Sequence, residues 1–207
     1  MTNKYTYRIE TPLDYDSVEG VIRDAFWNVY QPGCDEHFIV HKMRHNPAVV
    51  ECLNHVCVDG DIICGHIFYT KTKVVSDSGQ AFPVISFGPI SVLPDYQGKG
   101  IGSTLIRLTL DKAAKEGFPG VLIAGNPKYY HRFGFRPAAD FKIVADDGSS
   151  FPELMACELG EGRLENIHGR LFFCPEFSDI NQNEVLEFDR NFPPKKRLKL
   201  PGQLFSS

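Results

Sequence analysis

Three glycines alternate with other residues near the middle of the chain, and their spacing suits an anion-binding loop. The segment reads Gln97-Gly98-Lys99-Gly100-Ile101-Gly102, and an amphipathic stretch follows directly. Glycine lets the backbone approach a bulky anion without an intervening side chain. A helix that begins here adds unpaired N–H groups and a partial positive charge. The segment therefore predicts a site for phosphate groups.

Two familiar phosphate loops do not fit this spacing. A nucleotide P-loop, G-x-x-x-x-G-K-[ST], needs a lysine followed by serine or threonine, and no such pair follows these glycines. A dinucleotide loop, G-x-G-x-x-G, needs glycine where this chain has Ser103. The pattern that remains is Q-x-x-G-x-G, which Gln97, Gly100 and Gly102 fulfil.

This pattern and its surroundings resemble those of the GCN5-related N-acetyltransferase (GNAT) family. A hydrophobic run ends in Val92-Leu93-Pro94 before the loop, and residues 120–125 form a second strand-like run after the helix. The segment Tyr130-His131-Arg132-Phe133-Gly134-Phe135 follows. Residues 88–137 look like the predicted YhbS-like acetyltransferases, whose mid-chain reads FGPLSVxPxYQGKGIG followed by YYxRFGF. The ordered combination is specific, although each motif alone is less so.

The resemblance implies an α/β fold with a mixed sheet in the order β-α-α-β-β-β-α-β-α-β-β, whose fourth strand is bulged and splayed from the next. It implies an N-acetyltransferase that moves acetyl from acetyl-coenzyme A to an amine by direct attack, without a metal. The implied cofactor-binding residues are Ile90, Ser91, Val92, Gln97, Gly98, Lys99, Gly100, Ile101, Gly102, Ser103 and Asn126. A non-catalytic acyl-coenzyme A binding module, acting through a protein partner, is the alternative.

Tyr130 is the candidate catalytic residue because it lies four residues before Gly134, the offset of the family's catalytic tyrosine. A phenol with a pKa of about 10 can protonate a departing thiolate whose thiol has a pKa of about 8.5. Tyr129 is the competing candidate, and aromatic residues at this spacing also build cores.

Hydrophobic patterning predicts the elements that position these residues. The predicted strands cover residues 5–10, 53–58, 62–75, 83–92 and 120–125, and the helices residues 14–29, 35–44 and the stretch after the glycine loop. Asp59-Gly60 is the strongest hairpin signal between two of these strands. Gly88-Pro89 interrupts the fourth strand, because proline donates no ladder hydrogen bond, and so predicts a bulge there. Residues 171–175 are one more candidate strand.

The acceptor is a small-molecule or peptide amine whose identity the sequence does not select. In relatives of this shape the first two helices wall the acceptor side, so the candidates are Phe26, Trp27, Tyr30, Gln31 and His37. Acidic residues near that wall, Asp24, Asp35 and Glu36, favour a cationic amine. Candidates for the general base are Glu51, Asp61 and His66, and nothing in the sequence selects one of them.

Composition limits the class of protein. The chain has 207 residues and a net charge of −4, so we expect no general attraction to nucleic acid or anionic lipid. No apolar run approaches the roughly 20 residues of a membrane span, and the first residues lack a signal core, which favours a cytoplasmic protein. We expect a monomer or homodimer, and the sequence does not decide between them.

We expect an acetyltransferase domain over residues 1–160. Residues 161–207 would then form a C-terminal extension, packed on the domain or trailing from it, that ends in the basic, proline-broken and solvated segment 192–199. The six cysteines form no C-x-x-C pair and fit buried apolar positions better than metal ligation or disulfides.

Overall fold

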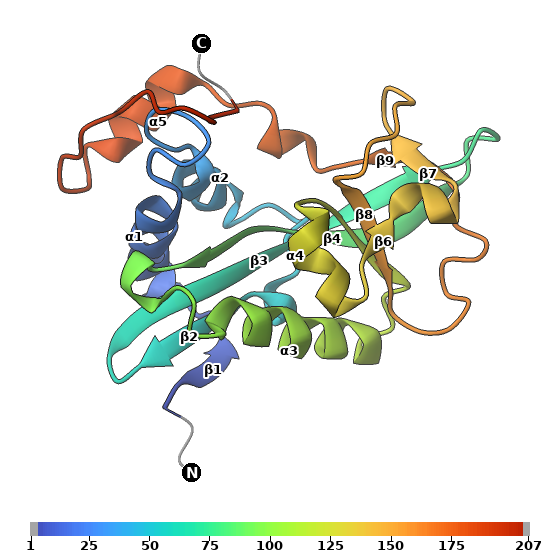
Figure 1. Ribbon diagram of the computed structural model, residues 1–207, viewed down its shortest axis with the longest axis horizontal. Helices are drawn as coiled ribbons and strands as arrows, with labels where there is room; N and C mark the ends of the chain where they lie inside the picture. Colours follow the sequence, from blue (N-terminus) through green and yellow to red (C-terminus); the bar gives the residue numbers. More distant parts are fainter. Residues whose placement is uncertain (1–3, 205–207) are drawn as a thin grey trace.

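A long antiparallel hairpin runs through the centre of the sheet in the computed structural model, which describes residues 4–204 (Figure 1). Its two strands are β3 (Ile62–Val75) and β4 (Ala81–Val92). β2 (His55–Asp59) joins β3 through a two-residue turn, with Asp59 opposite Ile62. Gly60 in this turn has a φ of 61°, a conformation that favours glycine. The predicted hairpin at Asp59-Gly60 is confirmed.

The described residues form a nine-stranded mixed sheet in which seven strands follow the order β1-β2-β3-β4-β5-β8-β6, while β9 pairs with β3 and β7. The pairings β4–β5 and β7–β9 are parallel, and the others are antiparallel. The remaining strands are β1 (Thr6–Ile9), β5 (Gly120–Ala124), β6 (Arg136–Pro137), β7 (Ile143–Ala145), β8 (Leu154–Glu158) and β9 (Gly169–Phe172). The predicted α/β class with a mixed sheet is confirmed.

Helices cover the sheet on both faces (Figure 1). α1 (Tyr15–Phe26) and α2 (Glu36–Met43) bury one apolar cluster against β2 and β3, around Ile22 and Phe68. α3 (Ile101–Lys115) buries another, around Leu105 and Tyr69. The short α4 (Pro127–Tyr130) follows β5. The sheet packs against these two clusters and a third around Leu122 and Leu171.

The fourth strand carries the bulge that its sequence predicts. Ile67 pairs with Ile90 and Tyr69 with Phe87, so Gly88 and Pro89 together oppose the single residue Phe68. Beyond the bulge β4 also separates from β5. The two strands pair only at Ile85 of β4, which lies opposite Val121 of β5. A gap thus opens between β4 and β5 on the side of Val92.

Backbone geometry fixes both ends of α3. Gly100 precedes the helix with a φ of 82°, in the left-handed region that favours glycine. At the other end Gly117 has a φ of 85°, and the N–H of Phe118 donates to the carbonyl of Ala113, as in a Schellman cap. The glycine loop therefore leads into the helix at a defined angle.

The first helix is shorter than its sequence suggests. We expect it over residues 14–29, but it ends at Phe26. Asn28 takes a φ of 61°, its N–H donates to the carbonyl of Gly33, and its Oδ1 accepts from the N–H of Gly33. This closed loop ends the helix although Val29 continues the apolar spacing.

The last part of the chain returns to the first two helices (Figure 1). Four strands follow α4, two more than we expect, and α5 (Gln182–Asp189) lies against α2. Arg23, almost fully buried, donates from Nε to Asp189 Oδ1 at 2.6 Å. Further on, the carbonyl of Lys196 accepts from Trp27 Nε1 and Asn28 Nδ2. The basic segment is thus exposed but held along α1, and the division at residue 160 stays a prediction.

Among residues 4–204 we find no helix with the length and apolar character needed to cross a membrane.

Candidate active site

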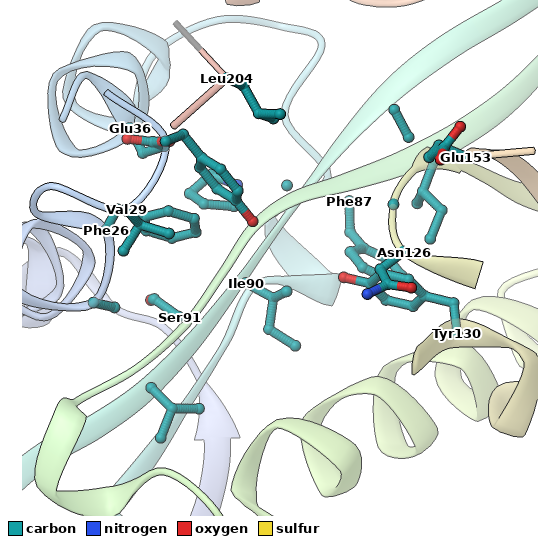
Figure 2. Close-up of a pocket in the computed structure, with 18 of the residues that line it drawn as sticks. Phe26, Val29, Glu36, Phe87, Ile90, Ser91, Asn126, Tyr130, Glu153 and Leu204 are labelled. Atoms are coloured by element: carbon teal, nitrogen blue, oxygen red, sulfur yellow. The ribbon is translucent and has the colours of Figure 1, made fainter. Parts of the chain in front are cut away.

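A cavity of about 1000 Å³ lies where β4 separates from β5, and it extends to α1 and α2 (Figure 2). One wall comes from α1, α2 and later parts of the chain, including Phe26, Val29 and Glu36. The opposite wall comes from the end of β5 and from α4, including Asn126 and Tyr130. The bulged part of β4, from Phe87 to Val92, forms its floor between the two walls.

The glycine loop presents free backbone donors beside this cavity. Within the part of the chain that the structure describes, the N–H groups of residues 98–103 donate no hydrogen bond. A Cβ atom at Gly98 or Gly100 would meet nothing within 4 Å, so the loop is open to a large group. A Cβ at Gly102 would lie 3.4 Å from the Tyr129 hydroxyl, so this glycine faces inward. The donor set and open space fit an anion such as pyrophosphate.

Two loop side chains are engaged with the chain itself. Gln97 Nε2 donates to the carbonyl of Val92 at 3.1 Å. Lys99 Nζ donates to the carbonyl of Asp95 at 2.7 Å and lies 4.8 Å from the centre of the Tyr96 ring. Ile101 is buried in the α3 core, while Ser103 in the first turn of α3 is half-buried. The loop therefore offers mainly its backbone N–H groups.

β4 presents backbone groups to the gap on alternate residues. The N–H of Leu93 donates to the carbonyl of Cys64 on β3. Because hydrogen-bonding directions alternate along a strand, Val92 and Ile90 direct their backbone groups toward the gap and Ser91 toward β3. Ser91 faces the cavity instead through Oγ, which is buried and has no hydrogen-bond partner within residues 4–204. An extended ligand arm could pair with Ile90 and Val92 as an added strand does.

Tyr130 is held at the cavity by aromatic packing. Its ring centre lies 5.9 Å from that of Phe87 and 5.7 Å from that of Phe135. A Cβ atom at Gly125 would collide with this ring, so glycine is required there. Burial raises the pKa of the Tyr130 phenol, so the group is neutral and carries its proton near pH 7. Tyr129, the competing tyrosine, does not line the cavity but points its hydroxyl to the start of α3.

Asn126 begins α4 and lines the cavity next to Tyr130 (Figure 2). Its side-chain oxygen accepts from the N–H of Lys128, so it caps the short helix and leaves its amide N–H groups free to reach a ligand.

The structure brings two of the five expected acceptor-wall residues to the cavity, Phe26 and Tyr30. Trp27 instead packs on Arg23 and binds the C-terminal segment. His37 is fully buried against Phe188 and Phe192 of the C-terminal part. Gln31 pairs with Gly33 in the loop after α1. Those three expectations are corrected, because the early end of α1 and the returning chain redirect the residues.

None of the three candidate bases reaches the large cavity. Asp61 lies in the exposed turn between β2 and β3. Glu51 lines a separate cavity of about 280 Å³, together with Glu10 and Arg44. His66 is completely buried, with Nε2 3.4 Å from Glu10 Oε1. The carboxylates that do line the large cavity are Glu36 and Glu153, and the sequence offers no signal that singles out either as a base.

Comparisons with known proteins agree with this fold. A sequence model described as an acetyltransferase (GNAT) domain matches residues 6–138. The uncharacterized N-acetyltransferase YhbS of Escherichia coli strain K12 is 26% identical over 171 residues, which are 83% of this chain and 97% of YhbS. The crystal structure of E. coli YhbS in complex with CoA matches with a TM-score of 0.76 at 20% identity, covering 87% of this chain and 96% of that one. A GNAT family acetyltransferase from Brucella melitensis, solved with acetyl-CoA, matches with a TM-score of 0.68 at 26% identity, covering 84% and 97%.

The bulged strand, the gap beside it and the glycine loop at the start of a helix define an acyltransferase of the GCN5-related type. The chain belongs to the GNAT acetyltransferase family. It is thus an enzyme of the N-acetyltransferase class.

Proposed function

We propose that this protein transfers the acetyl group of acetyl-coenzyme A to an amine by direct attack, with Tyr130 as the acid that protonates the leaving thiolate. The observation that carries this proposal is that one cavity joins three parts: the gap beside β4, the Tyr130 phenol and a separate wall from α1 and α2. Donor and acceptor can therefore enter the cavity from different sides and react directly, without an acetylated protein intermediate.

Binding of the donor would use the backbone of two elements. The free N–H groups of residues 98–103 would hold the pyrophosphate at the start of α3. Ile90 and Val92 would pair with the amides of the pantetheine arm in the gap, with Asn126 on the other side. When bound, acetyl-coenzyme A supplies the activated acetyl group as a thioester.

The residues at the meeting point would serve the two ends of the transfer. The amine nitrogen forms a bond to the acetyl carbon, and the carbon–sulfur bond breaks. The N–H of Val92, which points into the gap, would stabilise the oxygen of the acetyl group as it gains negative charge. Tyr130 would give its proton to the sulfur, because its buried phenol is neutral at physiological pH.

A thiol-release assay tests the proposal against the alternative of a non-catalytic acyl-coenzyme A binding module. The protein is incubated with acetyl-coenzyme A and a library of primary amines, and free thiol is followed over time. Amine-dependent thiol release supports the enzyme. Tight binding of acetyl-coenzyme A without release for any amine would support the binding module and contradict the proposal.

A further inference from the structure

Glu36 is the carboxylate on the acceptor-side wall of the cavity. It is the first residue of α2, and Figure 2 shows it beside Phe26 and Val29, across the cavity from Tyr130 and Asn126. Its carboxylate accepts from the N–H of Asp35, and no Lys, Arg or His of residues 4–204 lies within ion-pair distance of it. A half-buried carboxylate without a cation partner is a ready site for a cation from solution.

The neighbouring acidic residues do not compete for that role. Asp24 pairs with Lys195 of the C-terminal segment, with Nζ 2.5 Å from Oδ1. Asp35 accepts from Gln182 Nε2 of α5 at 2.7 Å. The expected acidic patch of Asp24, Asp35 and Glu36 is thereby corrected, because the returning C-terminal chain occupies two of its members. Glu36 alone of the three lines the cavity.

The pKa of Glu36 suits a group that exchanges a proton near neutral pH. Burial, with a smaller contribution from the negative charge of Asp35, raises this pKa to about 7, against hydrogen bonds from the backbone N–H groups of Glu36 and Asp35 that lower it. The other titratable groups beside it are Cys34 in the preceding loop and Tyr30 after α1. A catalytic base works best when its pKa lies near the operating pH.

Apart from the hydroxyl of Tyr30, the side chains around Glu36 on this wall are apolar. Phe26, Val29 and Ile39 from the first two helices are joined by Phe177 and Leu204 from the C-terminal part. Val29 and Leu204 are large apolar side chains left 47% and 70% exposed, so a ligand here would bury them. The wall therefore fits an apolar body with one positive group, and a polycation or sugar would leave its polar groups without partners.

We propose, on the basis of the acetyl transfer proposed above, that Glu36 binds the acceptor's ammonium group and removes its proton, and that the acceptor is a primary amine with an apolar body. The ammonium gives one proton to Glu36, and the neutral nitrogen forms the bond to the acetyl carbon. The nitrogen loses a second proton as the amide forms, which replaces the proton that Tyr130 gives to the thiolate. Glu36 then returns its proton to water, so one acetyl group is transferred and one proton released.

The variant Glu36→Gln tests this role, with Asp35→Asn as its matched control. The control substitution keeps a side-chain oxygen for Gln182 and removes a charge that does not line the cavity, so only Glu36→Gln removes the carboxylate from the cavity itself. Asp35→Asn should lower the pKa of Glu36, because the charge of Asp35 helps to raise it. We expect Glu36→Gln to lower kcat/KM for the best amine by about 100-fold and Asp35→Asn by about threefold or less. The affinity for acetyl-coenzyme A stays at the wild-type value in both variants.

The pH profile separates a proton acceptor from a merely structural residue. In the wild type, kcat/KM should rise with pH to a plateau above about 7, because Glu36 must lose its proton to act as a base. In Glu36→Gln that rising limb disappears, and activity increases at alkaline pH as the free amine becomes abundant. If Glu36→Gln lowered kcat/KM by the same factor at every pH, the role of Glu36 as a base would be overturned.

The acceptor class is tested with amines of equal charge, comparing aryl- and alkylamines with polyamines and aminosugars. A best acceptor that is a polyamine or aminosugar would overturn this part of the proposal. A large loss of kcat/KM in Glu153→Gln, with no loss in Glu36→Gln, would assign the base to the opposite wall and overturn the role of Glu36. These results all presuppose wild-type turnover, whereas absence of turnover with every amine would instead reject the proposed acetyl transfer.

Discussion

At the residue scale, burial sets the protonation state of the groups that face each other across the cavity. The apolar and aromatic surroundings of Tyr130 raise the pKa of its phenol, which keeps the proton on oxygen. The same effect raises the pKa of Glu36 to about 7, so a large fraction of this carboxyl group is ionised at neutral pH. The proposed acid and the proposed base are thus in suitable protonation states on opposite walls near neutral pH.

Tyr130→Phe removes the proposed acid and keeps the ring that packs on Phe87. We expect kcat to fall by about tenfold or more, which corresponds to roughly 1.4 kcal/mol of barrier, with acetyl-coenzyme A binding unchanged. Steady-state kinetics and calorimetry measure the two quantities. Tyr129→Phe is the comparison, because its hydroxyl lies toward α3 and outside the cavity. If kcat fell in Tyr129→Phe and not in Tyr130→Phe, the catalytic acid would be Tyr129 instead of Tyr130.

At the element scale, the start of α3 and the bulge of β4 form the proposed donor side of the site. Gly98 and Gly100 adopt left-handed φ angles of 74° and 82°, and within residues 4–204 the N–H groups of residues 98–103 donate no hydrogen bond. The bulge at Gly88-Pro89 coincides with the separation of β4 from β5. Both features follow from local sequence.

Gly100→Asp should abolish acetyl-coenzyme A binding, because it adds bulk and a like charge where the pyrophosphate would lie. Gly117→Asp is a matched control at the other end of α3: its φ of 85° imposes a similar backbone strain, and its Cβ likewise meets nothing within 4 Å. Calorimetry should show a loss of at least about 100-fold in affinity for Gly100→Asp only. Circular dichroism checks that both variants fold. Normal affinity in Gly100→Asp would place the phosphate elsewhere.

The elements of the proposed donor side could be predicted from sequence, and those of the proposed acceptor side could not. The glycine loop, the Gly88-Pro89 bulge and the hairpin at Asp59-Gly60 each depend on residues that are adjacent in the sequence. All three have the predicted local structure. The acceptor wall depends on contacts over long sequence distances. Trp27 and His37 turn away because residues near 188–196 bind them, and the spacing around these residues carries no sign of that.

At the scale of the whole molecule, the C-terminal part lines the proposed acceptor wall with Phe177 and Leu204 and is attached through a buried charge. Arg23 has 2% of its side chain exposed, and Asp189 binds it with two hydrogen bonds. His37 Nε2 lies 3.4 Å from the same carboxylate. This connection holds α5 and the following segment, which lines the cavity with Leu204.

Asp189→Asn should destabilise the protein because it leaves the buried guanidinium of Arg23 without a counter-charge. We expect a loss of about 3 kcal/mol in the free energy of unfolding, measured by urea denaturation. Glu187→Gln is the control on the same helix, since its ion pair with Arg190 is 70% exposed on the Glu187 side and contributes about 1 kcal/mol or less. Equal effects of the two substitutions would show that the buried pair does not hold α5 in place.

The central claim is direct transfer of acetyl from acetyl-coenzyme A to an amine within one cavity, and the fate of a labelled acetyl group tests it most directly. The protein is mixed with acetyl-coenzyme A that carries a deuterated acetyl group, first alone and then with the best primary amine, and intact protein and small molecules are analysed by mass spectrometry. The account predicts label in the amine product and none on the protein at any time. Label that accumulates on the protein and then passes to the amine, or label that never leaves coenzyme A, would contradict it.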